Sequence, residues 1–326
     1  MSVNSLAFKT LGWTHQFLAA ATGKPRLSIL IYHRVLDQPD AFLPEIPDVK
    51  MFNWQMELLH RYYTVVSLAE AIELLQSKQL PPRTACVTFD DGYADNFLNA
   101  LPVLKQWQIP ATFFVASGFL NGGMMWNDVV LEAIRSYQDK QLDLQAFGLK
   151  CYQLDNLDQR RQTAAELLPA IKYLPPDQRD EMTQYLAEQV NNHLPDNIMM
   201  STAQLKQLHA SGMEIGAHTV SHPILSKLTE DQAAQEISAG REQLTALLDG
   251  ANIRFFAYPN GKPGQDYTDR DANLLKQLGF EAAVSTRWSA ATSEADLFQL
   301  PRFTPWDTTP FKFAARLMKN AMLPYE

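Results

Sequence analysis

Two adjacent aspartates at the end of a buried strand constrain this chain more than any other feature. Residues 84–89 (TACVTF) form a short apolar and β-branched run, which predicts a buried strand, and Asp90, Asp91 and Gly92 follow it directly. Parallel α/β sheets and barrels place their chemistry at the carboxyl ends of strands. Neighbouring carboxylates repel each other when both are ionised, so one normally meets a cation or keeps a proton. The pair therefore indicates an active site at this strand end.

A second motif supplies two imidazoles. The sequence HTVSH at residues 218–222 follows another predicted strand, at 213–218. Two neutral imidazoles and one carboxylate suit Zn²⁺, Fe²⁺, Co²⁺, Ni²⁺ or Mn²⁺. Each motif alone is weak, because an Asp-Asp-Gly is often only a turn. Together they predict that Asp91, His218 and His222 bind one divalent metal, with Zn²⁺ the preferred ion, in a catalytic site that leaves coordination positions open.

The order of the predicted elements indicates an α/β fold, a distorted (β/α) barrel of about seven strands. Strands and helices alternate at the spacing of βαβ units. Strands are expected at 27–32, 63–66, 84–89, 111–115, 213–218, 253–258, 280–285 and 297–300. Helices are expected at 52–62, 68–76, 95–107, 202–210, 230–248 and 269–278.

The region from about 122 to 200 breaks this alternation. It contains three amphipathic patterns, at 127–138, 157–173 and 176–192, and few β-branched runs. We interpret it as a helical insertion in the barrel or a cap over its mouth. Residues 1–326 are then expected to form a single catalytic domain, with an N-terminal helix at 1–24 and this insertion.

Composition excludes several classes of function. The chain has 326 residues, a net charge of −8 and no basic cluster, which argues against nucleic acid as a partner. The two cysteines require no disulfide and fit a reducing compartment. No apolar run approaches the roughly 18 residues that a transmembrane span needs. A cytoplasmic location is expected, with peripheral membrane association and secretion as alternatives; the sequence leaves the oligomeric state open.

The two motifs resemble those of the polysaccharide deacetylases, the group that includes chitin, peptidoglycan and poly-N-acetylglucosamine deacetylases. Residues 88–92 match the family motif TFDDG, and residues 218–222 match H-[ST]-x-x-H. The resemblance covers roughly residues 27–120 and 200–305. It implies a barrel with fewer than eight strands and a metal-dependent hydrolase that removes acetyl groups from N-acetylated sugars of a polysaccharide or glycan intermediate. Asp90 would be the general base.

The third family motif, close to R-x-P-Y-G, is altered here. The sequence FAYPNG at 256–261 places Ala257 where the family has an arginine that steadies the catalytic aspartate. Asn260 stands in place of a tyrosine whose backbone N–H helps to bind the oxyanion, and a backbone donor survives this change. Arg302 is a candidate to orient Asp90 instead. The alternative for Arg302 is a surface ion pair.

The family's C-terminal Leu-x-His strand is also missing, since no histidine follows His222. The strand at 27–32 that leads to His33 resembles it, as in a circular permutation that places this strand first. We therefore assign to His33 the general acid that protonates the departing amine. The alternative is a structural histidine bonded to a loop carbonyl.

Four aromatic residues are candidates for binding an N-acetylated glycan substrate. They are Tyr93, Trp126, Tyr258 and Trp288. The alternative for each tryptophan is a place in the core or at its rim.

Other functions remain open at this point. The same chemistry would serve an O-acetyl esterase or a deformylase acting on a lipid-linked sugar. The altered motifs are compatible with a non-catalytic sugar-binding relative. Two histidines and one carboxylate also occur in non-haem iron oxygenases, although the order of the motifs on an α/β barrel favours the deacetylase.

Overall fold

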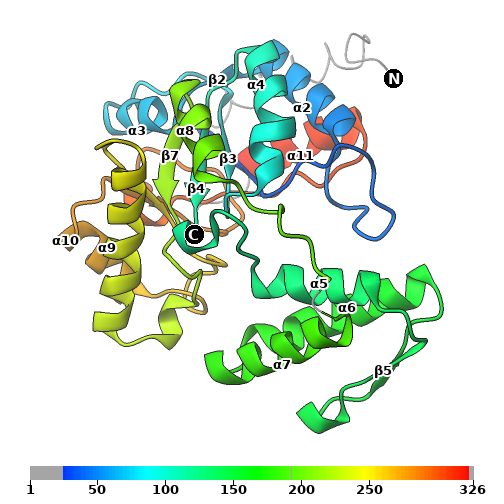
Figure 1. The fold of residues 1–326 in the computed structure, drawn as a ribbon. Coiled ribbons are helices and arrows are strands. Elements are labelled where there is room, and N and C mark those ends of the chain that lie inside the picture. The colour runs from blue at the N-terminus through cyan, green and yellow to red at the C-terminus, as the bar shows by residue number, and fades with distance from the viewer. Residues whose placement is uncertain (1–24, 192, 323–326) are drawn as a thin grey trace.

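The central sheet has seven strands and curls into a barrel (Figure 1). The computed structural model describes residues 25–191 and 193–322, so the helix expected at 1–24 lies outside the described residues. All pairings in this sheet are parallel, in the order β1-β3-β4-β7-β8-β9, with β2 also on β3. The strands are β1 (Leu27–Tyr32), β2 (Thr64–Val65), β3 (Thr84–Phe89), β4 (Ala111–Val115), β7 (Glu214–Ala217), β8 (Phe255–Ala257) and β9 (Ala282–Val284). The predicted α/β barrel is confirmed.

An irregular segment closes the barrel between β9 and β1. The prediction of a strand at 297–300 is wrong, because Leu297–Gln299 forms a 3₁₀ helix that Asp296 caps. The next residues join the two edges instead: the Leu300 N–H donates to the Ala283 carbonyl, and the Phe303 N–H donates to the Ile29 carbonyl. This connection lays residues 300–303 beside the first strand and carries Arg302 into the barrel.

Strand residues alternate between two apolar clusters, as the period of a β-strand requires. One cluster lies inside the barrel, and the helix α3 (Leu68–Gln76) packs on it. Its strand members are Leu27, Ile29, Cys86, Phe114, Phe255, Ala257, Ala282 and Val284. The other, larger cluster lies between the strands and the outer helices. Both faces of the sheet are therefore buried, which explains the continuous apolar runs in its strands.

The outer helices cover the barrel on two sides (Figure 1). On one side lie α2 (Val49–Tyr62), α4 (Leu101–Trp107) and α11 (Pro310–Met322), and on the other α9 (Glu230–Leu247) and α10 (Asp269–Gln277). The remaining barrel helix is α8 (Thr202–Ala210), and the π-helical turn Asn96–Ala100 precedes α4. Among the described residues no helix combines the length and apolar character needed to cross a membrane.

The insertion forms a small body beside the barrel (Figure 1). It consists of α5 (Trp126–Ser136), α6 (Leu157–Lys172) and α7 (Pro176–Gln189), with a hairpin of β5 (Gln141–Asp143) and β6 (Cys151–Gln153). These elements share an apolar cluster of their own, which Phe42 and Leu43 join from the loop after β1. The three helices were predicted; the hairpin was not.

Candidate active site

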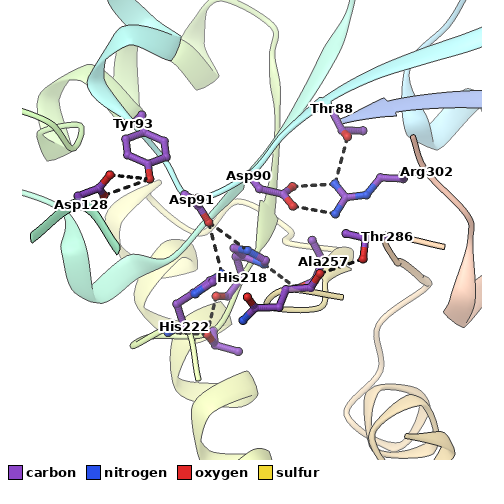
Figure 2. Close-up of polar contacts among 12 residues, drawn as sticks. Thr88, Asp90, Asp91, Tyr93, Asp128, His218, His222, Ala257, Thr286 and Arg302 are labelled. Atoms are coloured by element: carbon purple, nitrogen blue, oxygen red, sulfur yellow. Dashed lines mark hydrogen bonds and ion pairs between the residues drawn. The ribbon is translucent and has the colours of Figure 1, made fainter. Parts of the chain in front are cut away.

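Three side chains from two strand ends converge on one point (Figure 2). Asp91 follows β3, and His218 and His222 follow β7. The Asp91 Oδ1 lies 3.3 Å from the His218 Nε2 and 3.5 Å from the His222 Nε2. One potential ligand atom from each residue lies within 4.8 Å of the others. The positions of these three side chains therefore agree with the sequence prediction that they share one site.

The hydrogen-bond pattern of this cluster fits a bound cation. The His218 Nδ1 lies 2.7 Å from the Ala257 carbonyl oxygen, so it carries the proton in the neutral ring, and the Nε2 lone pair faces Asp91. The Asp91 Oδ1 is buried and has no hydrogen-bond donor among the described residues. A buried carboxylate oxygen facing a nitrogen lone pair is unfavourable unless a cation or a proton lies between them. The three residues therefore suit a divalent ion of the Zn²⁺ type.

Burial and charge shift the pKa values of the three residues in different directions. Burial raises the pKa of Asp91, but the neighbouring imidazoles of His218 and His222 outweigh it, so this pKa lies below its ordinary value. Burial also lowers the pKa of His218, and there the adjacent carboxylates of Asp91 and Asp90 outweigh it and raise the pKa. For His222 burial dominates and lowers the pKa to about 4. Asp91 is thus an anion and His222 a neutral ring at neutral pH, which are the forms that bind metal.

Neighbouring groups hold the loop at 218–222 in a strained shape. Thr219 and His222 adopt left-handed backbone conformations, with φ of 64° and 55°. The Thr219 hydroxyl accepts the His222 N–H at 3.0 Å. Glu236 on α9 accepts the N–H groups of Val220 and Ser221 at 3.0 and 2.9 Å. A β-branched residue at positive φ is rare and needs such support, so Glu236 is a positioning residue that the sequence analysis missed.

Asp90 is paired with Arg302 inside the barrel (Figure 2). Both carboxylate oxygens accept from the guanidinium at 2.7 Å, and Arg302 is fully buried. The guanidinium also donates to the Thr88 hydroxyl at 3.1 Å and to the Ser285 carbonyl at 3.0 Å. Burial raises the pKa of Asp90, but the charge of Arg302 outweighs it and keeps this pKa below its ordinary value. The contact expected of an orienting Arg302 is present, and a surface ion pair is ruled out for it.

A cavity of about 510 Å³ opens over these groups. Asp90, Asp91 and both histidines line it, together with His33 at the end of β1. The His33 side chain is exposed, and its carbonyl accepts from the Asn96 amide at 2.8 Å. Asn260 lines the cavity in a left-handed conformation, with φ of 60°, and its N–H has no hydrogen-bond partner among the described residues. Both residues therefore line the same cavity as Asp90 and the ligand cluster, and their catalytic roles stay predictions.

The insertion supplies another wall of this cavity. Trp126, Asn127 and Asp128 from the start of α5 line it, as predicted for Trp126. The Tyr93 hydroxyl donates to the Asp128 carboxylate at 3.1 Å (Figure 2). The Arg34 guanidinium lies 4.9 Å from the Tyr93 ring centroid. Burial is the largest cause that raises the pKa of Asp128, to about 7. Tyr93 lines the cavity but is almost fully buried.

Two of the predicted substrate-binding aromatics lie elsewhere. Tyr258 is fully buried, its ring stacks on Tyr267 at 3.7 Å, and its hydroxyl donates to the Phe298 carbonyl. Tyr258 points to the outer face of the sheet and packs there in the larger apolar cluster, between the strands and the outer helices. Trp288 packs against Trp306 at 5.1 Å and beneath Arg316 of α11. Neither residue lines the cavity. Full burial contradicts the assignment of Tyr258 to substrate binding, whereas Trp288 is 40% exposed and its assignment stays a prediction.

Comparison with known proteins agrees with this arrangement. The sequence profile of the family described as polysaccharide deacetylase matches residues 77–174 and 181–283. The Bacillus subtilis protein YxkH, named for the same family, is 22% identical over 284 residues, which cover 86% of this chain and 72% of that protein. Because the profile matches more than half of the chain, the chain belongs to the polysaccharide deacetylase family and is a carbohydrate deacetylase, a hydrolase.

Solved structures share the fold. The Streptococcus pyogenes deacetylase PplD, solved with acetate, has a TM-score of 0.61 at 20% identity, covering 92% of this chain and 100% of that one. IcaB from Ammonifex degensii has a TM-score of 0.59 at 23% identity, covering 90% and 97%. A de-N-acetylase from Aggregatibacter actinomycetemcomitans has a TM-score of 0.55 at 17% identity, covering 90% and 99%.

Proposed function

We propose that the chain is a metal-dependent N-deacetylase of a glycan, with the metal held by Asp91, His218 and His222. The observation that carries the proposal is the buried Asp91 Oδ1, which faces two imidazole nitrogens and has no donor among the described residues. Zn²⁺ is the preferred ion because it suits two imidazoles and a carboxylate in an open site. When bound, such an ion supplies a Lewis acid and lowers the pKa of water.

The protein's own groups would carry the proton transfers. Asp90 is held by Arg302 with both oxygens fixed and its pKa lowered, so it is ionised and can accept a proton as general base. His33 would donate a proton to the amine as it leaves, because an amide nitrogen leaves poorly as an anion. The unpartnered Asn260 N–H would donate to the developing oxyanion. The products would be acetate and a free amino sugar.

We also propose that the insertion belongs to the same catalytic unit. The cavity over Asp90 and Asp91 includes Trp126, Asp128 and Leu131 of α5 and Leu168 of α6. An N-acetyl sugar bound there would contact the barrel and the insertion together. Separation of the insertion from the barrel would remove this wall.

Acetate release tests the proposal. Purified protein is stripped of metal with a chelator, supplied with Zn²⁺, Co²⁺, Ni²⁺, Fe²⁺ or Mn²⁺ in turn, and incubated with N-acetylated and O-acetylated glycans. We expect acetate from the N-acetylated glycans only in the presence of a metal. The variant Asp90→Asn should keep the metal and lose activity by about 10²–10⁴-fold. Release of acetate only from O-acetylated glycans would contradict N-deacetylation, and full activity of Asp90→Asn would refute the assignment of the base.

A further inference from the structure

The segment that carries His33 has no regular secondary structure, although it follows β1 directly. Residues 33–35 belong to no strand or helix, and the His33 side chain is exposed. Its imidazole forms no hydrogen bond with another described residue. No neighbouring side chain therefore holds the ring, so its position depends on how firmly the backbone of this segment is fixed.

The chain just after β3 holds this backbone with three side chains. The Asn96 amide donates to the His33 carbonyl at 2.8 Å, and the Asn99 amide donates to the Val35 carbonyl at 2.8 Å. The Asp95 carboxylate accepts the Val35 N–H at 3.1 Å. Side chains thus satisfy three polar groups of the irregular segment, which in a strand or helix would bond to other backbone groups.

Asn96 begins a π-helical turn that is unusual in its geometry and in its hydrogen bonds. The Leu101 N–H donates to the Asn96 carbonyl, and Pro102 interrupts the ordinary helical ladder because it has no N–H for the carbonyl four residues before it. Such turns are rare and often lie at functional sites. Asn96 is fully buried, and its side-chain oxygen has no donor among the described residues. Since an unpaired buried acceptor is destabilising, stability alone does not explain this side chain.

The same stretch of chain carries the proposed base and one proposed metal ligand. Asp90 and Asp91 precede Asn96 by six and five residues. The Asp90 N–H donates to the Tyr32 carbonyl at 2.9 Å, and His33 is the next residue after Tyr32. This stretch therefore holds the end of β1 at two successive carbonyls, and it ties the backbone of the proposed acid to that of the base.

We infer that Asn96 is a positioning residue for His33, and that the turn after β3 fixes the proton donor in the same cavity as Asp90. This inference rests on the proposed function and adds to it the group that holds the acid. Without the Asn96 amide the His33 carbonyl loses its donor, so the ring takes up further directions and protonates the leaving amine less often. Asp90 and the ligand cluster keep their own contacts, so metal binding and water attack should be preserved.

Two acetyl compounds with different leaving groups test the inference. The amine of an N-acetyl sugar needs a proton as it leaves, whereas 4-nitrophenyl acetate releases a stable phenolate that needs none. For the N-acetylglucosamine hexamer, β-1,4- or β-1,6-linked, that the native protein deacetylates, Asn96→Leu should lower kcat/KM about fivefold, which corresponds to about 1 kcal/mol. Its kcat/KM for 4-nitrophenyl acetate and its Zn²⁺ affinity should stay native. The matched control is Asn53→Leu, which removes a 3.0 Å hydrogen bond from Trp107 outside the cavity and should change neither activity.

Combination with His33→Gln distinguishes positioning from a general structural effect. Because Asn96 acts through His33, Asn96→Leu should cause no further loss on the hexamer in the His33→Gln protein. Additive losses, or equal losses on the two compounds, would overturn the inference. Asn99→Ala removes a half-buried side chain of the same turn, and a smaller loss of the same kind is expected from it, so the test survives if Asn96→Leu fails to fold.

A measurement without turnover keeps this inference separate from the proposed reaction. In protein labelled at histidine, the NMR signal of the His33 ring is assigned by its loss in His33→Gln. Asn96→Leu should shift or broaden this signal, and an unchanged signal would overturn the inference even where the native protein releases acetate. If the native protein releases no acetate from any glycan, the proposed reaction fails, while a shifted signal still supports the hold of Asn96 on His33. Full activity of His33→Gln on the hexamer would overturn the inference and leave deacetylation standing.

Discussion

Replacement of Arg302 by methionine should damage both stability and catalysis, because Arg302 makes the largest favourable charge interaction with Asp90. Arg302 is fully buried and donates twice to Asp90 at 2.7 Å. Removal of one partner of a buried ion pair costs about 3–5 kcal/mol, since the other charge remains buried. Arg302→Met also leaves the Ser285 carbonyl without the donor that Arg302 supplies at 3.0 Å. We therefore expect the free energy of unfolding to fall by at least about 3 kcal/mol.

The effect on catalysis follows from the pKa of Asp90. Burial raises this pKa, and the charge of Arg302 outweighs it in the native protein. Without Arg302 the effect of burial remains, so the pKa of Asp90 rises and the base is protonated over more of the neutral range. The acid limb of kcat/KM should move to higher pH. Activity at pH 7 should fall by about 10²–10⁴-fold, as for loss of a general base, and part of it should return as the pH increases.

Urea unfolding and the pH profile of acetate release measure the two effects. The double variant Asp90→Asn with Arg302→Met has no unpaired charge, so it should be more stable than the sum of the single losses predicts. Arg61→Met is the control, because Arg61 forms an exposed pair with Glu57 that should be worth less than about 1 kcal/mol. An unchanged acid limb in an Arg302→Met protein that folds and binds metal would refute the reasoning.

Three further variants test how the site is held. Glu236→Gln weakens the acceptor that fixes the metal loop, so Zn²⁺ affinity, measured by calorimetry, should fall about 10–100-fold; unchanged affinity would dismiss Glu236 as a positioning residue. Gly240→Ala places a Cβ 2.8 Å from the Thr219 carbonyl carbon, so it should lower the melting temperature, although this change usually stabilises a helix. Asp128 has a pKa of about 7 in the folded protein against 3.8 ordinarily; the folded state then binds more protons between these values, and stability falls as the pH rises through them. The melting temperature of metal-free Asp128→Asn should therefore exceed that of the native protein at pH 8 and approach it at pH 4. The same difference between the two melting temperatures at pH 8 and at pH 4 would contradict the shifted pKa.

Elements with strong local signals could be predicted closely from the sequence. The strand β3 and the helix α3 have the predicted bounds, Thr84–Phe89 and Leu68–Gln76. An uninterrupted apolar run defines the first. Ser67 begins the second, where its hydroxyl accepts the Glu70 N–H at 3.1 Å. Where the apolar pattern agrees with the residues that begin or end an element, tertiary contacts did not shift the bounds of that element.

Other elements lacked such a signal or had one that was overlooked. The prediction of a strand at 297–300 was wrong because only isolated backbone hydrogen bonds join that segment to the neighbouring strands. The hairpin of β5 and β6 has only three residues in each strand. The helix α11 could have been found, since Pro310 stands at its start and Phe313, Ala314 and Leu317 recur at helical spacing on its buried face.

The site itself was predictable only as far as its motifs. The ligand triad and Asp90 come from two local patterns that follow strands. The sequence cannot show which face of a strand holds Tyr258, and the structure buries that residue on the outer face. Nor can it show that Glu236, from the middle of α9, reaches back to the metal loop. The contact of Arg302 with Asp90 depends on how the barrel closes, which no local pattern contains.

Titration of the metal-stripped protein with Zn²⁺ tests the central claim most directly. We expect one Zn²⁺ to bind per chain, and Asp91→Asn and His222→Ala each to abolish this binding while circular dichroism shows that the fold is kept. Asp90→Asn should bind Zn²⁺ with the native stoichiometry, because Asp90 contacts Arg302 and lies outside the ligand cluster. Equal Zn²⁺ binding by the native protein and by the Asp91 and His222 variants, or loss of binding in Asp90→Asn alone, would contradict the account.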